Sequence, residues 1–357
     1  MHHPRTHLGA LAASLLLVVA AGPARGETPG RVHVFEGPSV GGQIVAVSPN
    51  GIEIETRGKT LKVPIENIRE VTFTSEPQAL KTARIGIAKG QPAQALEDLK
   101  AIESGEMEGA DQLVVDDFAF AKAAAVGGKA AASGENLAAG EKALLEYLGD
   151  HPQSHHFFPM QELLARVLTM RGKYGEAADA LVPLDKGPPS FKVRASAARA
   201  RIFYDQKKYD DALQAYKSAA AIPTPPEDEA STVQKRAAQL GAARCLARQG
   251  KTDDAVELVE RQIAESDPGD VEVLSRAYLV LGDAWRAVGK DQDAIVAYLT
   301  VELVHNGIPD NRAEALFNLV ELWDKGKFVQ RAEEARQQLA AYPDSIWARK
   351  LAGGKSP

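Results

Sequence analysis

Two short amphipathic segments on either side of Gly289 form the clearest hydrophobic pattern in the chain, within Ser275–Asn306. In the first segment, apolar or small residues at helical spacing predict one buried stripe: Tyr278, Leu281, Gly282, Trp285 and Val288. Gly289 favours the left-handed backbone conformation that commonly follows a helix end. In the second segment Ala294, Tyr298 and Val301 recur on one face, and the small Ala294 lets two backbones lie close together. The pattern predicts two packed helices joined by a tight turn.

Variants of this helix pair recur over residues 77–352, which predicts a mainly α-helical solenoid of six or seven units. A small residue is expected near the start of each second helix: Ala95, Gly140, Ala177, Ala212, Ala255, Ala294, and Arg331 or Ala332. The first five intervals between these positions are 45, 37, 35, 43 and 39 residues, so the loops differ in length. Three stretches rich in Gly, Pro and Ser are predicted to be exposed loops: Gly127–Leu137, Gly187–Ser190 and Pro223–Glu229.

This repeating pattern resembles the tetratricopeptide repeat (TPR), a helix–turn–helix unit of about 34 residues with a large–small–aromatic signature. The resemblance implies stacked helix pairs whose first helices line a concave, partner-binding groove. The ending Tyr342–Ala348 resembles periplasmic TPR proteins of Gram-negative envelopes, including the Tol-associated coordinator and outer-membrane assembly lipoproteins. The chain lacks the lipid-attachment cysteine of the lipoproteins and the N-terminal coiled coil of the coordinator. The resemblance implies a non-enzymatic interaction scaffold or adaptor in the cell envelope.

Residues 31–74 have a different hydrophobic period, of two residues. Apolar residues that alternate with polar ones predict two strands: Ile52, Ile54, Leu61 and Val63. Asn-Gly at 50–51 and Arg-Gly at 57–58 predict tight hairpin turns. The unit resembles a small SH3-like or Sm-like β barrel. Because so small a unit buries little surface, we expect it to pack against the solenoid or against a second copy of itself.

The first 26 residues have the pattern of a secretory signal peptide. Arg5 precedes the uncharged apolar run Leu8–Ala21, and small residues follow, with cleavage expected after Ala24 or Gly26. The run is shorter than the roughly 20 residues that a membrane-spanning helix needs. The pattern predicts a periplasmic or secreted protein, and an uncleaved anchor is the alternative.

The charge and the single cysteine exclude some classes of function. A formal net charge of −6 argues against nucleic acid or an anionic membrane surface as a partner, because both require a basic surface. Cys245 is the only cysteine, so an intrachain disulfide is impossible, and its apolar neighbours predict a buried structural thiol. No spacing of nucleophile, base and orienting group matches a catalytic motif, so no catalytic residue and no cofactor are predicted.

Three histidines lie close together at His151, His155 and His156, but Pro152 interrupts them and no metal-ligand helix spacing is formed. Solvated loop histidines are therefore the prediction, without a metal site, and a metal site is the alternative.

The most suggestive candidate site is a row of arginines. Alignment on the small residue of each unit places Arg166, Arg201 and Arg244 at one equivalent position in three successive units. Neighbouring positions complete the predicted partner-binding set: Arg194, Tyr204, Arg248 and Arg286. Guanidinium groups bind carboxylates in a bidentate manner, so the row suits an acidic peptide or a chain terminus. The alternative is a solvated face in which the arginines pair with Glu162, Asp205 and Asp283.

Two functions from other classes stay open beside the adaptor. One is a carbohydrate-binding or hydrolytic envelope protein that uses the groove. The other is a homo-oligomeric structural element assembled through the β barrel.

Export is directly testable. Because the basic start, the apolar run and the small-residue exit direct cleavage, mass spectrometry of the native protein should find a mature N-terminus between Gly22 and Glu27. Recovery of an intact Met1 from the cytoplasmic fraction would contradict the prediction.

Overall fold

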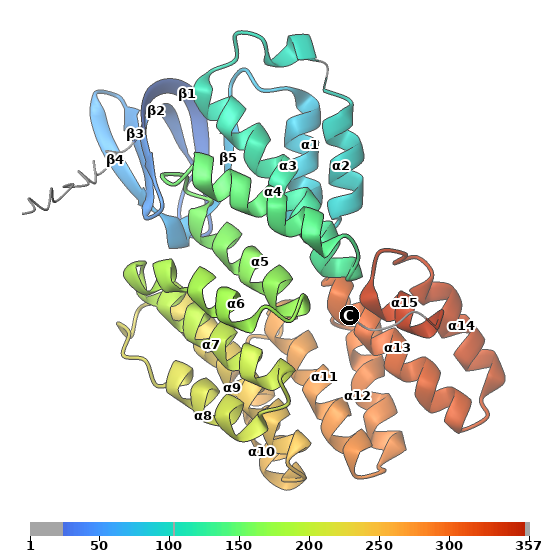
Figure 1. Cartoon of the computed structure of the whole chain (residues 1–357). Helices are drawn as coiled ribbons and strands as arrows, with labels where there is room; N and C mark the ends of the chain where they lie inside the picture. Colours follow the sequence, from blue (N-terminus) through green and yellow to red (C-terminus); the bar gives the residue numbers. More distant parts are fainter. Residues whose placement is uncertain (1–23, 103, 354–357) are drawn as a thin grey trace, which may run out of the picture.

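The computed structural model describes residues 24–102 and 104–353, as a β-sheet followed by helices (Figure 1). The predicted signal peptide lies outside the described residues, except that Ala24–Gly26 begin the first strand. That strand continues to Val34, so cleavage at either expected position leaves most of it in place.

The sheet has five antiparallel strands in the order β4-β3-β2-β1-β5, with a 3-10 turn, η1 (Ile65–Asn67), before the last strand. The strands are β1 (Ala24–Val34), β2 (Val40–Ser48), β3 (Gly51–Thr56), β4 (Lys59–Pro64) and β5 (Ile68–Phe73). Both predicted hairpins are present, with Ser48 paired to Gly51 and Thr56 paired to Lys59. Leu61 was expected on a buried strand face but is 42% exposed, because β4 lies at the sheet edge.

Beyond the sheet, the described residues form seven helix pairs and a last short helix, which confirms the solenoid. The pairs are α1 (Gln78–Ala88) with α2 (Pro92–Lys100), α3 (Gln112–Ser133) with α4 (Leu137–Asp150), α5 (Phe157–Met170) with α6 (Tyr174–Ala180), α7 (Pro189–Asp205) with α8 (Tyr209–Ala220), α9 (Glu229–Arg248) with α10 (Thr252–Glu265), α11 (Val271–Ala287) with α12 (Asp291–Leu303), and α13 (Pro309–Lys325) with α14 (Val329–Leu339). Helix α15 (Ile346–Leu351) follows them, and short 3-10 segments lie at η2 (Ser104–Met107) and η3 (Val182–Lys186).

The small residues predicted near the start of each second helix are all buried: Ala95, Gly140, Ala177, Ala212, Ala255, Ala294 and Ala332. In the last unit the buried position is Ala332. Residues with positive φ lie in the turns between the paired helices: Gly90, Gly134, Asn136, Gly172, Lys207, Gly250, Gly289 and Lys327. Each unit therefore repeats one local geometry, a left-handed turn followed by a close helix contact.

The contact between α11 and α12 shows how close the paired helices come. A Cβ atom added to Gly282 would lie 2.5 Å from Cε1 of Tyr298, which is fully buried. The Tyr298 hydroxyl donates to Oδ1 of Asp283 at 2.8 Å, so the ring is held in place. Val288, predicted on the buried stripe, is 50% exposed because α11 already ends at Ala287.

The prediction of an exposed loop at Gly127–Leu137 is wrong. Helix α3 continues to Ser133, and only a short turn separates it from α4. The glycines serve close packing, since a Cβ atom on Gly127 would lie 2.8 Å from Cδ1 of Leu144, and one on Gly140 would lie 2.8 Å from the Ala130 side chain. The composition of the stretch reflects a helix contact and not a flexible segment.

The sheet shares one hydrophobic core with the first helices. Val32, Ile44 and Ile54 from the strands pack in the same cluster as Leu80 of α1 and Val114 of α3. The expected support for the small β unit therefore comes from α1, α2 and α3.

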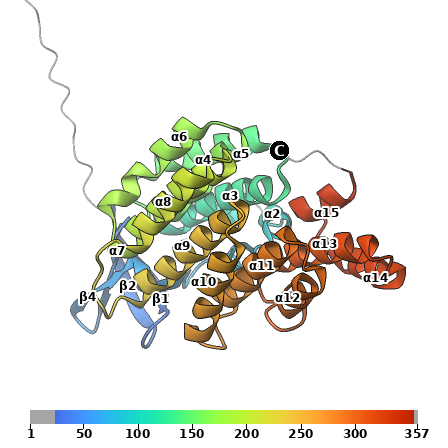
Figure 2. The same ribbon diagram turned by 90° about the horizontal axis from the view of Figure 1, so that it is seen from below.

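The helix array turns back on itself. Each first helix contacts the first helix of the next unit, from α1 through to α13, and α15 contacts α3 (Figure 2). Arg349 of α15 forms an ion pair with Glu135, and Arg166 of α5 lies 3.6 Å from Asp310 of α13. We call the side of the array on which α5, α7, α9, α11 and α13 bring polar side chains together the inner face.

Among the described residues, no helix combines the length and apolar character needed to cross a membrane.

Substitution of Gly282 by Ala tests the helix contact. We expect the free energy of unfolding to fall by roughly 1–3 kcal/mol, because the added methyl group overlaps the fixed Tyr298 ring. Gly149→Ala is the matched control, since Gly149 is also helical and its added Cβ would meet nothing within 4 Å. That control should gain up to about 1 kcal/mol from helix propensity. Urea unfolding followed by circular dichroism measures both, and equal midpoints for the two variants would contradict the contact.

Candidate functional site

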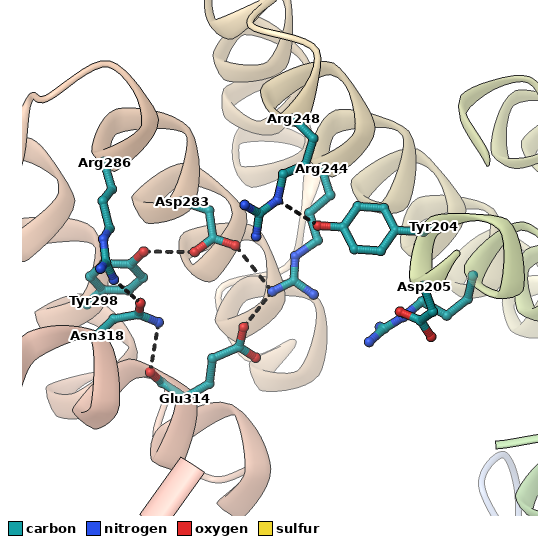
Figure 3. A network of polar contacts seen from close by, with 10 residues as sticks. Tyr204, Asp205, Arg244, Arg248, Asp283, Arg286, Tyr298, Glu314 and Asn318 are labelled. Carbon is teal, nitrogen blue, oxygen red and sulfur yellow. Dashed lines mark hydrogen bonds and ion pairs between the residues drawn. The ribbon is translucent and has the colours of Figure 1, made fainter. Parts of the chain in front are cut away.

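The centre of the inner face is an ion-pair network between first helices of three units (Figure 3). Nη2 of Arg244, on α9, lies 2.6 Å from Oε1 of Glu314 on α13 and 3.4 Å from Oδ2 of Asp283 on α11. The three side chains are 15–23% exposed. Because Arg244 and Glu314 are 70 residues apart in sequence, the curvature of the array is what brings them together.

Hydrogen bonds from Arg286, on α11, extend this network along α13 (Figure 3). Arg286 donates from Nη1 to Oδ1 of Asn318 at 2.6 Å and from Nη2 to Oε2 of Glu321 at 2.7 Å. The Asn318 side-chain amide donates in turn to the backbone carbonyl of Glu314, on the same helix, at 2.9 Å. Asn318 therefore anchors Arg286 to the backbone of α13.

On the other side of Arg244, contacts link α9 to α7. Arg248 donates from Nε to the Tyr204 hydroxyl at 3.1 Å, so Tyr204 lies beside the network as predicted (Figure 3). Arg201 donates from Nε to Oδ1 of Asp205 at 2.9 Å. The Arg201 side chain nevertheless stays 56% exposed, which leaves much of its guanidinium open to solvent.

The two remaining predicted arginines lie toward the start of the array. Arg166 is 56% exposed and contacts Asp310 across the inner face. Arg194 pairs with Glu162 and lies over the Phe191 ring at 4.7 Å. The acidic partners considered in the alternative interpretation, Glu162 among them, are thus all paired with arginines of the predicted row.

Carboxylates surround the central arginine of the inner face. Glu314 holds the pKa of Arg244 above its ordinary value. Burial raises the pKa of Glu314 above its ordinary value, although the charge of Arg244 opposes this shift. With Asp283 also beside Arg244, the centre carries two carboxylates for one guanidinium. Among the predicted arginines that pair with carboxylates, Arg166 and Arg201 have the most exposed side chains and keep donors for a further ligand.

Cys245 is buried, as predicted. Burial raises the pKa of its thiol to about 11, so the reactive thiolate is scarce at neutral pH.

The prediction that the histidines are solvated is wrong for His155, which is only 8% exposed. These histidines lie between α4 and α5, against α3. Nε2 of His156 lies 3.1 Å from Oδ1 of Asp117, and the His156 ring stacks on Phe120 with centroids 3.4 Å apart. Arg84 of α1 donates to the other Asp117 oxygen and lies 2.5 Å from Glu76.

A cavity of about 320 Å³ lies beside this cluster, between the sheet and the helices. Its apolar side consists of Ile44, Val47, Ile52, Val71, Phe73 and Leu113. Its polar side includes three carboxylates and three histidines: Asp116, Asp117, Asp150, His151, His155 and His156. Nδ1 of His151 lies 3.4 Å from Oδ1 of Asp116.

The charge states within the cluster follow from burial and hydrogen bonding. Burial lowers the pKa of His155 well below its ordinary value, and that of His156 as well, so both imidazoles are neutral at neutral pH. Burial alone would raise the pKa of Asp117, but hydrogen bonds from His156 and Arg84 outweigh it and keep Asp117 ionised. The sequence analysis missed Asp117 and Arg84, because they lie 39 and 72 residues before His156 on other helices.

Comparison with known proteins shows the fold. No family model and no curated protein matches the chain. Among solved structures, a Rap protein complexed with competence and sporulation factor has a TM-score of 0.53 at 16% identity, covering 78% of this chain and 76% of that one. NprR in complex with its cognate peptide NprX has a TM-score of 0.46 at 15% identity, covering 77% and 81%. A tetratricopeptide repeat protein from Parabacteroides merdae has a TM-score of 0.45 at 16% identity, covering 75% and 93%. The helices form a TPR-like array.

Removal of the central guanidinium gives a pH-dependent prediction. Arg244→Leu should lower the free energy of unfolding by roughly 2–3 kcal/mol near neutral pH, because two carboxylates lose their cation. Arg244 holds the Glu314 pKa down, so its loss raises that pKa further. The folded variant then binds a proton more tightly than the unfolded chain, and the loss of stability should shrink as the pH falls from about 8 to about 5.

Urea midpoints across that pH range test the effect. Arg261→Leu is the control, because Arg261 makes only an exposed pair with Glu257 on the same helix, and it should change stability by less than about 0.5 kcal/mol. An Arg244→Leu deficit that is equal at both ends of the range would contradict the role given to Glu314.

Proposed function

We propose that this protein is a non-enzymatic adaptor whose inner face binds an extended peptide segment of a partner protein. The observation that carries the proposal is the convergence of polar side chains from α5, α7, α9, α11 and α13 on one face of the array. The likeness to the Rap protein, which is complexed there with competence and sporulation factor, supports a binding role for this kind of array. At 16% identity it supports no residue assignment.

The chemistry of the inner face suits a segment with acidic side chains. Arg201 directs only its Nε to Asp205, and Arg166 makes one ion pair across the face, so both have guanidinium donors available. A carboxylate of the partner would join these half-exposed groups without leaving a buried charge unpaired. Tyr204 adds a hydroxyl group of the kind that binds a peptide backbone.

The proposal also includes a location for the adaptor, the cell envelope. The signal-peptide pattern and the resemblance of Tyr342–Ala348 to periplasmic TPR proteins support a role in the cell envelope. The meander order of the sheet, with β5 returning to β1 after a 3-10 turn, supports an SH3-like or Sm-like relationship. The acidic net charge of −6 supports a protein rather than a nucleic-acid partner.

Site-specific crosslinking tests where a partner binds. A photoreactive residue at Tyr204 should capture a partner polypeptide from cell extract, while the same residue at Val296, 64% exposed on the second helix α12, should not. Equal capture at both positions would place the partner elsewhere.

Binding measurements on the identified partner then test the arginines. The double variant R166A/R201A should bind about 5- to 25-fold more weakly at low salt, since each half-exposed ion pair contributes up to about 1 kcal/mol. The control R261A/R276A removes two arginines of similar exposure that pair within their own helices. We expect the control to bind like the parent, and the difference between the variants to shrink at high salt because screening weakens exposed pairs. Parent-like affinity of R166A/R201A at low salt would remove these arginines from the site.

A further inference from the structure

The polar cluster where the sheet meets the helices contains a set of metal-ligand groups. Asp117, His155 and His156 each direct one ligand atom to a common region, and these atoms all lie within 4.8 Å of one another. In two of these residues, Nε2 of His156 and Oδ1 of Asp117 are 3.1 Å apart. Atoms bound tetrahedrally to one Zn²⁺ at 2.0–2.1 Å lie about 3.3 Å apart, so this pair has nearly the required spacing.

Neighbouring residues hold this pair in position. Arg84 binds Oδ2 of Asp117, which directs Oδ1 toward His156. Phe120 stacks on the His156 ring, and the Ser154 hydroxyl accepts a hydrogen bond from the His156 backbone N–H at 3.0 Å. Such outer contacts orient metal ligands in characterised zinc sites.

A polar network without a metal explains part of the cluster but not His155. Arg84, Glu76, Asp117 and His156 satisfy one another through ion pairs and hydrogen bonds. His155 is more than nine-tenths buried and faces the cavity, and its ring lies against the His156 ring with centroids 3.8 Å apart. Within the described residues, no side chain forms a hydrogen bond with the His155 ring. A ligand that reaches His155 through the cavity would supply the partner that its imidazole lacks.

The charge around the cavity favours a cation. The lining residues, all of them described, include Asp116, Asp117 and Asp150 and no lysine or arginine. The nearest cation, Arg84, is matched by Glu76 and Asp117. A divalent ion would therefore meet excess negative charge, whereas an anion would meet repulsion.

We propose that Asp117, His155 and His156 bind a Zn²⁺ ion, with one coordination position open to the cavity. Two imidazoles and a carboxylate are a donor set that zinc accepts, and three protein ligands leave a fourth position for water or another ligand. Ligation by Nε2 of His156 places the ring proton on Nδ1. The apolar side of the cavity, with Phe73 and Ile44, would limit solvent access to the ion. This site lies on α3 and the α4–α5 loop and is independent of the inner face.

Zinc binding by the full chain, freed of metal by a chelator, tests the proposal. Titration calorimetry with ZnCl₂ should give one ion per chain, zinc should raise the melting temperature, and Co²⁺ should give the visible absorption of a tetrahedral site. His155→Gln keeps the side-chain volume and breaks no hydrogen bond, so it should fold like the parent by circular dichroism. Loss of an outer-shell contact alone weakens metal affinity by about 10–100-fold, so loss of this direct ligand should weaken it by about 100-fold or more.

His305→Gln is the matched control, because His305 is also a buried histidine but lies between α12 and α13. It should bind zinc like the parent. Asp117→Asn keeps an oxygen for Arg84 and should also lose zinc. The proposal is overturned if the parent binds no zinc beyond the level of His155→Gln, or if His305→Gln loses zinc to the same extent.

Discussion

Close contact between helices at small residues is the constraint on which the rest of this structure depends. At Gly282, as at Gly241, the neighbouring helix carries a tyrosine ring that leaves no space for a Cβ atom. Such contacts fix the distance and angle between successive helices, because a close-packed interior cannot deform without cost. Repeated over seven pairs, the same geometry makes the array turn until α13 faces α5 and α15 reaches α3.

The inner face is a consequence of that curvature. Arg244 would be a solvent-exposed charge on an isolated α9, but the turn of the array places Glu314 and Asp283 around it. A row of positive charge in the sequence thereby becomes a network of ion pairs in the folded protein. Because Arg244 is already paired with carboxylates, a partner would gain little binding free energy from an ion pair with it. Arg166 and Arg201 are more exposed, so each can bind a carboxylate of a partner beside or in place of its present one. Under the proposed function, binding should therefore depend on where a partner's acidic groups lie relative to Arg166 and Arg201, and not on acidic character alone.

Features set by a few neighbouring residues could be predicted from the sequence. Gly289 and Ala294 define the turn and the helix contact within one unit, so the repeat was evident without a structure. The pairing of Arg244 with Glu314 and of Asp117 with His156 depends on elements distant in sequence, and no local pattern encodes it. Gly127 was misassigned for another reason, since a glycine that permits close packing of helices has the same sequence signature as a glycine in a loop.

Helix α3 connects the two proposed sites. Asp116 and Asp117, near its start, line the cavity at the sheet, and its far end contacts α15, next to the Arg349–Glu135 ion pair. The same helix therefore carries groups of the cluster around His155 and lies at the contact between the first and last parts of the array. Arg166, on the adjacent α5, reaches across the inner face to Asp310 of α13. The rigid helices that position the cluster at the sheet are thus also those that set the curvature of the inner face.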